Sequence, residues 1–195
     1  EINAVDKILT SHRSTPQKDM WIVFAPEIPG EWRSNKINVE TETDRFIVKQ
    51  DHQRLASCSL ASHLGIATNT PTQLDRTALR DELSKLSKVF YDEAIWTKQR
   101  SSCVTKAYHR LINATPPSRR GGQMKDCSIF EHVLAIMREL RHKGFNERSV
   151  FLTSNTNDFI DSTTRNPKPP IDTDLASVDL TLDLTWALAV RSLNI

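Results

Sequence analysis

The stretch from Ser149 to Phe159 constrains the fold of this chain more than any other. A short β-branched and aromatic run, Val150 to Thr153, ends abruptly in small polar residues that lead to Asp158. This pattern is typical of a buried parallel strand whose carboxyl end opens into a polar loop. Ligands bind at such strand ends in open α/β sheets. Upstream, Asp126 stands at the start of a strongly apolar helical pattern, so two carboxylates on adjoining elements favour a cation site.

Length and composition narrow the class of protein. The chain has 195 residues, enough for one domain with a substantial core. Its 26 basic and 24 acidic residues leave a net charge of +2, so the overall charge does not indicate nucleic acid. The three cysteines lack metal-type spacing, as expected of reduced intracellular thiols. No apolar run approaches the ~18 residues of a membrane span, and no signal peptide is evident, so a cytoplasmic protein without membrane contact is expected.

Helical and strand patterns alternate outside a helical middle. We expect helices over residues 2–12, 126–142 and 185–193, and buried strands over residues 21–25, 149–153 and 180–184. Pro29 fits the first position of a helix that begins near residue 30. Between residues 43 and 113 we find no strand pattern, so about 40–112 is predicted to be a helical insertion. Residues 161–174 are predicted to be a proline-rich surface excursion.

Three segments of the chain form an ordered set of motifs. Ile22–Trp32 is a strand, a proline and then a helix with a glutamate, and Gly122–Glu131 places an aspartate at the start of a buried helix. Val150–Phe159 is a strand followed by Thr-x-Asn-x-x-Asp-Phe. In this order the motifs resemble the PIN-domain nucleases, in particular a bacterial PIN-like subgroup. The resemblance implies a single PIN-like domain over residues 1–195: a three-layer α/β/α fold with a mainly parallel central sheet and the helical insertion.

The resemblance also implies a set of site residues. Glu31, Asp126 and Asp158 fall on metal-ligand positions of the family. Thr153 falls on a hydroxyl position beside the last strand, and Asn155 stands where many relatives have aspartate. Because asparagine donates an oxygen without charge, a second metal ion should bind more weakly here. The expected cation is Mg²⁺ or Mn²⁺, which lowers the pKa of a bound water and clamps the attacking and leaving oxygens of a phosphodiester.

The amino-terminal end departs from the family pattern. The family begins with a strand that ends in an aspartate, followed by Thr or Ser and then Asn, and this aspartate is the central metal ligand. Asp6 instead lies within a helical pattern, so we expect the first family strand to be missing before residue 1. Asp6 as its substitute is the minority interpretation. A chain that lacks this strand would be inactive alone.

Each candidate ligand also has a purely structural interpretation. Asp126 would act as a helix N-cap, and Asp158 would cap the turn after its strand. Glu31, in the first turn of a helix, would only complement the helix dipole. Glu131 follows Asp126 by five residues, or about 140° around the helix axis, so an ion pair or a supporting role beside the metal ligands is expected for it rather than a shared metal.

The resemblance implies a metal-dependent endoribonuclease. RNA is favoured over DNA because most bacterial relatives attack RNA, and a toxin or phage-defence role with an antitoxin or defence partner would follow by the same analogy. Arg119 and Arg120 are candidate phosphate-binding residues, with a solvated loop as the alternative. The second hypothesis is a catalytically degenerate module that binds nucleic acid or a partner protein through the helical insertion. A flap-type DNA nuclease is third, and a homodimer is compatible with each.

Overall fold

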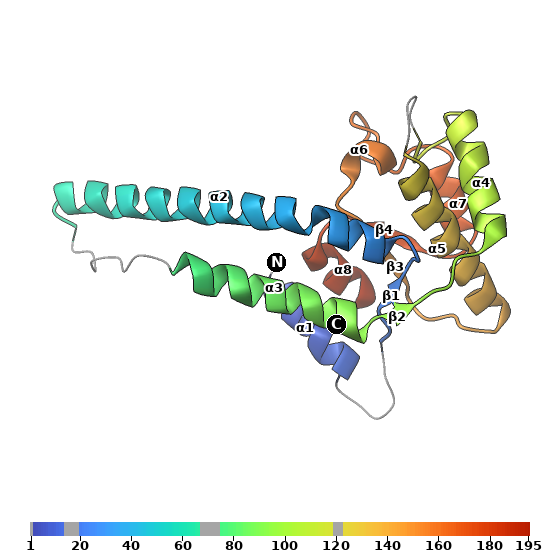
Figure 1. The fold of residues 1–195 in the computed structure, drawn as a ribbon, viewed down its shortest axis with the longest axis horizontal. Helices are drawn as coiled ribbons and strands as arrows, with labels where there is room; N and C mark the ends of the chain where they lie inside the picture. The colour runs from blue at the N-terminus through green and yellow to red at the C-terminus, as the bar shows by residue number, and fades with distance from the viewer. Residues whose placement is uncertain (1, 14–19, 67–74, 119–122) are drawn as a thin grey trace. The chain divides into compact units, whose positions relative to one another are not determined.

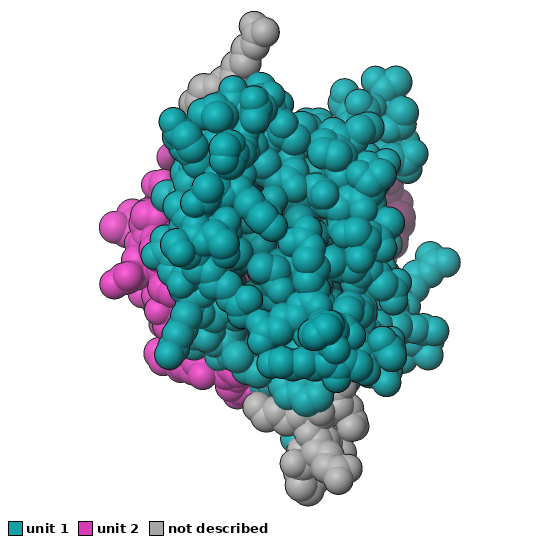
Figure 2. All heavy atoms as spheres, turned by 90° about the vertical axis from the view of Figure 1, so that its right-hand side faces the viewer, with its two compact units in different colours: residues 1–28, 94–195 teal, residues 29–93 magenta. Residues whose placement is uncertain are grey.

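The computed structural model describes residues 2–13, 20–66, 75–118 and 123–195. Figure 1 shows the helices and strands. The chain divides into two compact units, which Figure 2 colours separately: unit 1, residues 1–28 and 94–195, and unit 2, residues 29–93. Helices hold 65 % of the described residues. The segment expected as a helical insertion, about 40–112, overlaps unit 2, but its last part belongs to unit 1.

The strands form two separate two-stranded parallel sheets. β1 (Val23–Phe24) pairs with β2 (Ile95–Trp96), and β3 (Val150–Leu152) pairs with β4 (Thr181–Asp183). The expected three-layer α/β/α fold with a mainly parallel central sheet is therefore wrong for the described part of the chain. Each apolar run contributes only two or three paired residues, and no described strand joins one sheet to the other. Two short sheets among helices are the result.

The strand predictions themselves hold in shortened form. The runs at 21–25, 149–153 and 180–184 each contain an observed strand, at β1, β3 and β4. The prediction that residues 43–113 contain no strand is wrong, because β2 lies there. A strand of two residues is too short to show the alternation by which strands are recognised in a sequence.

Helix α5 (Met124–His142) lies at the centre of the core of unit 1, as the pattern over 126–142 predicts. The rings of Phe130, Phe151 and Phe159 contact one another, with centroids 5.4 to 6.1 Å apart. Burial of each such side chain stabilises the fold by roughly 1.5–3 kcal/mol. The full buried cluster consists of Phe130, Leu134, Met137, Phe151, Phe159, Ile171, Leu175, Val178 and Leu180.

Helix α4 (Ser101–Ile112) packs along α5. The residues of α4 that are buried in unit 1 are small: Cys103 is 2 % exposed and Ala107 is fully buried. Small side chains allow two helix backbones to approach closely, which brings the polar residues of α4 within reach of those on α5. This close packing positions the buried charges described below.

The other helices of unit 1 are short. They are α1 (Ile2–Arg13), α6 (Thr156–Phe159), α7 (Ile171–Ala176) and α8 (Trp186–Leu193). Helix α1 confirms the helix expected over 2–12 and packs against α8. Thr185 is the N-cap of α8, and its hydroxyl accepts the Leu188 N–H at 3.2 Å. Helix α7 begins inside the segment expected as a surface excursion, because Ile171 and Leu175, one helical turn apart, are buried.

Unit 2 contains two long helices, α2 (Ile28–His63) and α3 (Arg76–Glu93). Pro29 lies in the first turn of α2, as the sequence predicts. The rings of Trp32 and Tyr91 contact each other, with centroids 5.0 Å apart, and link the start of α2 to the end of α3. Among the described residues of unit 2, six large apolar side chains are more than half exposed: Ile37, Val39, Phe46, Leu60, Leu64 and Ile66.

Candidate functional site at the carboxyl edge of the second sheet

Three of the predicted site residues are joined by hydrogen bonds just after β3. The Asn155 N–H donates to the Thr153 hydroxyl at 3.2 Å, and the Asn155 side-chain amide donates to Oδ2 of Asp158 at 2.7 Å. The Asp158 N–H donates to Oδ1 of Asn155 at 3.3 Å, so Asn155 is the N-cap of α6. Because Asn155 supplies the cap, the Asp158 carboxylate is not required for it. Thr153, Asn155 and Asp158 form one local group, and Asp158 is only 7 % exposed.

Asp183 lies at the same edge of the sheet, at the end of β4. It pairs with Leu152, and its carbonyl accepts the Thr153 N–H at 3.0 Å. The carboxyl ends of parallel strands meet at one edge, where ligands commonly bind. The Asp183 side chain is 6 % exposed, and its Oδ2 has no hydrogen-bond partner among the described residues. Asp183 is not among the residues predicted from the sequence. A charged residue between Leu182 and Leu184 is nevertheless a signal, because a buried parallel strand is usually apolar throughout.

Replacing Asp183 with asparagine is expected to stabilise the metal-free protein by about 1 kcal/mol. A buried polar atom without a partner costs about 1–3 kcal/mol, and the amide removes the charge while keeping the shape. Urea unfolding in EDTA measures the change. Asp172→Asn, at an exposed position of α7, is the matched control and should leave the free energy of unfolding nearly unchanged. A clear loss of stability in Asp183→Asn would mean that the fold itself requires this carboxylate.

Asp126 lies in the first turn of α5 and is half-buried. The N-cap of α5 is Gln123, so the interpretation of Asp126 as an N-cap is wrong. Phe130 follows one turn later on the same helix face, and its ring contacts that of Phe159, with centroids 5.6 Å apart. Phe159 directly follows Asp158 in the sequence. The amino-terminal half of α5 therefore lies beside α6.

The structure does not place the remaining sequence candidates at this edge. Glu31 belongs to unit 2, where it occupies the first turn of α2 and its Oε2 accepts the Asn35 side-chain amide at 3.0 Å. Asp6 is exposed on α1. Arg119 and Arg120 lie outside the described residues.

The donors at this edge are oxygens, which suit a hard cation. In the described ranges, no three histidine, cysteine, aspartate or glutamate side chains are grouped so as to hold a metal ion. Mg²⁺ does not need such a group, because it keeps several waters and binds through one or two carboxylates together with substrate phosphates. Asp158 and Asp183 are buried carboxylates, and a cation would satisfy the unpartnered Oδ2 of Asp183. The chemistry of the donor set therefore fits Mg²⁺ or Mn²⁺.

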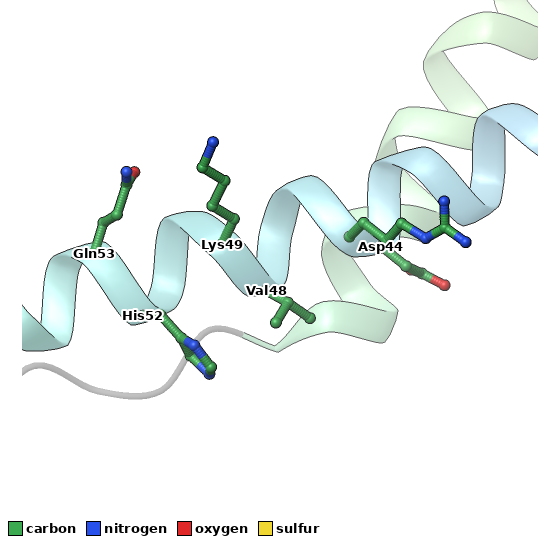
Figure 3. A pocket seen from close by; sticks show the side chains of 6 residues that line it. Asp44, Val48, Lys49, His52 and Gln53 are labelled. Carbon is green, nitrogen blue, oxygen red and sulfur yellow. The ribbon is translucent and has the colours of Figure 1, made fainter.

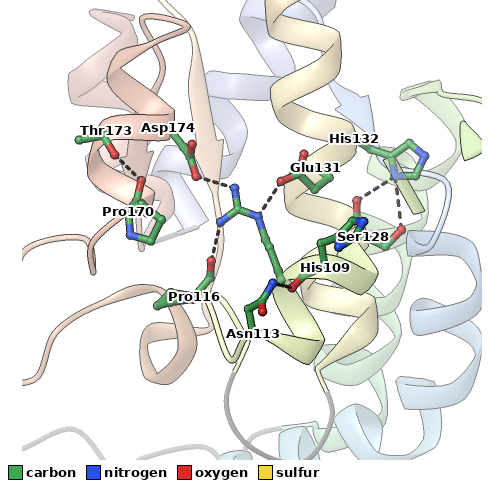
Figure 4. Close-up of polar contacts among 10 residues, drawn as sticks. His109, Asn113, Pro116, Ser128, Glu131, His132, Pro170, Thr173 and Asp174 are labelled. Carbon is green, nitrogen blue, oxygen red and sulfur yellow. Dashed lines mark hydrogen bonds and ion pairs between the residues drawn. The ribbon is translucent and has the colours of Figure 1, made fainter. Parts of the chain in front are cut away.

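A buried ion-pair cluster joins α4, α5 and α7 (Figure 4). Arg110 donates to Oε1 of Glu131 at 2.6 Å, to Oδ2 of Asp174 at 2.5 Å and to the Pro116 carbonyl at 2.6 Å. Its guanidinium carbon lies 4.9 Å from the centroid of the Phe130 ring. Burial lowers the pKa of Arg110, but the hydrogen bonds with Asp174 and Glu131 outweigh it, and the pKa lies above its ordinary value. The ion pair expected for Glu131 is confirmed.

Ser128, His132 and Glu27 form a second buried polar cluster. The Ser128 hydroxyl donates to Oε1 of Glu27, and Nδ1 of His132 lies 2.8 Å from the Ser128 carbonyl, as Figure 4 shows in part. Nε2 of His132 accepts the backbone N–H of Arg100 at 3.0 Å. Arg100 is the N-cap of α4, so His132 ties the start of α4 to α5. Ser128 is 4 % exposed and His132 is 1 % exposed, so this serine–histidine–glutamate set holds helices together and is closed to substrate.

Cys127 is not a nucleophile in the folded protein. The side chain is fully buried beside Asp126. Burial is the main cause that raises the pKa of its thiol, to about 11, so the thiol is protonated at neutral pH.

A surface depression on unit 2 does not form a site. Its lining residues all come from α2: Asp44, Arg45, Val48, Lys49, His52 and Gln53. Figure 3 shows Lys49 and Gln53 on one side of the helix and Val48 and His52 on the other, so these side chains do not converge on a common point.

Comparison with known proteins gives no relative for this chain: no family model, curated protein or solved structure matches it. Within the part of the chain that the structure describes, no helix is both long and apolar enough to cross a membrane.

Proposed function

We propose that this chain is a metal-dependent endoribonuclease whose site is the carboxyl edge of the β3–β4 sheet. One observation carries the proposal: hydrogen bonds join Thr153, Asn155 and Asp158 at this edge, where the buried Asp183 also lies. The resemblance of three motifs to the PIN-domain nucleases supports hydrolysis of a phosphodiester as the reaction. The oxygen donors support a hard cation as the cofactor.

The side chains have distinct roles in this proposal. Asp158 and Asp183 would hold Mg²⁺ or Mn²⁺, which, when bound, lowers the pKa of a water ligand and neutralises charge on the phosphate. Asp126 stays a prediction from the resemblance, because no group of three such side chains forms among the described residues. Asn155 restrains the Asp158 carboxylate through its side-chain amide, and the Thr153 hydroxyl restrains the Asn155 backbone. Such preorganisation of a ligand by its neighbours is needed for metal affinity and activity. Glu31, Arg119 and Arg120 stay predictions from the resemblance.

The setting of the reaction is also part of the proposal. Cys58, Cys103 and Cys127 are free thiols, which supports a reducing compartment such as the cytoplasm. By analogy with bacterial PIN-like nucleases, the proposal includes a toxin or phage-defence role, with an antitoxin or defence protein as partner.

Cleavage of a labelled single-stranded RNA tests the proposed function. We expect cleavage by the full-length protein in Mn²⁺ or Mg²⁺, no cleavage in EDTA, and recovery when the metal is restored. A DNA strand of the same sequence should be cleaved much more slowly. Cleavage of DNA in preference to RNA would favour a flap-type nuclease instead, and RNA binding without cleavage in any divalent cation would contradict the proposal.

A non-catalytic binding module is the second candidate function. Two observations favour it: among the described residues no three metal-binding side chains are grouped, and Asn155 stands where many PIN-like relatives have aspartate. Such a module would bind RNA or a protein partner with the same affinity in wild type and in Asp158→Asn. The metal-dependent cleavage assay separates the two functions directly.

A further inference from the structure

A cationic side chain is hydrogen-bonded to the residue that precedes Asp158. The Lys168 ammonium donates to the Asn157 carbonyl at 2.6 Å, and Asn157 directly precedes Asp158. The ion pairs of the described residues do not include Lys168, which is half-buried. Asp161 is an acidic group on the same loop. Hydrogen bonds from the backbone of Thr164 and then of Thr163 are the main causes that lower the pKa of its carboxyl, and the charge of Lys168 contributes least. The Asp161 carboxylate is therefore occupied mainly by these backbone groups.

The fold fixes the position of Lys168. Its N–H donates to the Phe159 carbonyl at 2.9 Å, and its own carbonyl accepts the Ile171 N–H at 2.6 Å. The preceding residue, Pro167, forms an antiparallel bridge with Ile160, which closes the loop between α6 and α7. Lys168 is therefore tied to the end of α6 on one side and to the start of α7 on the other. An ammonium held in this way loses little conformational entropy when it binds an anion.

We propose that Lys168 binds a phosphate of the RNA substrate beside the carboxylates at the β3–β4 edge. The inference rests on the proposed function. Asp158 and Asp183 repel the phosphates of an approaching RNA, so a substrate needs a compensating cation close to them. An ammonium has three N–H donors, and the Asn157 carbonyl uses one of them, which leaves two for phosphate oxygens. A phosphate contact positions the chain of RNA and carries no base specificity.

Two substitutions separate this role from a structural one. A glutamine at position 168 keeps a donor for the Asn157 carbonyl and removes the charge. An arginine keeps the charge and the donor. If Lys168 only closed the loop over α6, Lys168→Gln would behave like the wild type. Lys143→Gln is the matched control, because Lys143 is an exposed lysine paired with Glu139 and its loss changes the net charge equally.

Binding of a labelled single-stranded RNA to the full chain, measured by anisotropy in EDTA over a range of salt concentrations, tests the inference. One lost phosphate contact lowers the slope of log K against log salt by about 0.7, which is about a fivefold loss of affinity at 0.1 M salt. We expect this from Lys168→Gln, recovery to within about twofold in Lys168→Arg, and no change in Lys143→Gln. In the Mn²⁺ cleavage assay, Lys168→Gln should raise KM and leave kcat nearly unchanged.

The outcomes distinguish this inference from the proposed function. Equal losses of affinity in Lys168→Gln and Lys143→Gln, or an unchanged salt slope, would overturn the phosphate contact even if the wild type cleaves RNA. Absence of cleavage by the wild type, with the specific loss of binding in Lys168→Gln retained, would overturn the endoribonuclease and support the contact.

Discussion

Replacing Arg110 with alanine is expected to lower the free energy of unfolding by about 3–5 kcal/mol, the usual cost of leaving a buried charge without its partner. The Arg110 side chain is 11 % exposed, and it is the cation that faces Glu131, 5 % exposed, and Asp174. Its loss leaves both carboxylates and the Pro116 carbonyl without these hydrogen bonds. Urea unfolding at pH 7, followed by far-UV circular dichroism, measures the change.

An exposed ion pair provides the control for Arg110. Arg100 contacts Glu139 at 2.7 Å, but both side chains are more than 40 % exposed, so Arg100→Ala should have a much smaller effect. The hydrogen bond from Lys143, followed by that from Arg100, lowers the pKa of Glu139 to about 2. Because the folded pKa is depressed, the contribution of this pair is lost only as the pH falls towards about 2, and the pair is intact at pH 7.

A combined variant identifies the source of the expected loss. If uncompensated charge is the cause, Arg110→Met together with Glu131→Leu and Asp174→Leu should recover most of the stability, because buried ion pairs are often replaceable by apolar groups of similar volume. A loss below about 1 kcal/mol in Arg110→Ala would instead mean that water reaches the two carboxylates and solvates them.

The helices were predictable because their signals are local. The apolar spacing within residues 126–142 predicts α5 without knowledge of its neighbours, and Gly144, with φ of +85°, lies just beyond its end. The sheet was not predictable in the same way. Pairing between β3 and β4 joins residues about thirty positions apart. A local sequence pattern predicts a strand, but it does not predict which other strand pairs with it. The prediction of one central sheet was wrong because it required pairing between strands that are distant in the sequence.

In the candidate site, too, local contacts were predictable from the sequence and contacts between distant residues were not. Thr153, Asn155 and Asp158 lie within six residues of one another, so a strand followed by a polar turn was enough to predict that they act together. Asp183 joins them only through the register of β4 against β3. The angle of Glu131 on its helix predicted an ion pair, but its partner Arg110 comes from α4 and was not identifiable from spacing. The contact of Arg110 with Asp174, which lies 64 residues away in the sequence, was equally unpredictable from spacing.

Asp158→Asn is expected to lower kcat/KM for cleavage of single-stranded RNA in Mn²⁺ by at least about 100-fold. Loss of a residue that only supports a metal ligand typically costs about 10–100-fold, and a direct ligand should cost no less. Asparagine keeps the shape of the buried side chain but donates to a cation without charge, so a higher Mn²⁺ concentration should restore part of the activity. Initial rates at several RNA and Mn²⁺ concentrations measure both effects.

RNA binding by Asp158→Asn in EDTA should not be weakened, unlike its cleavage activity. Removing a carboxylate from the site reduces repulsion of the phosphates, so Asp158→Asn should bind RNA as tightly as the wild type or more tightly. A folding defect would weaken binding and cleavage together, and Asp172→Asn should alter neither. Full cleavage activity in Asp158→Asn at every Mn²⁺ concentration would remove Asp158 from the metal site. The endoribonuclease proposal would then lose the side chain on which its geometry depends, since Thr153 and Asn155 are linked to a cation only through that carboxylate.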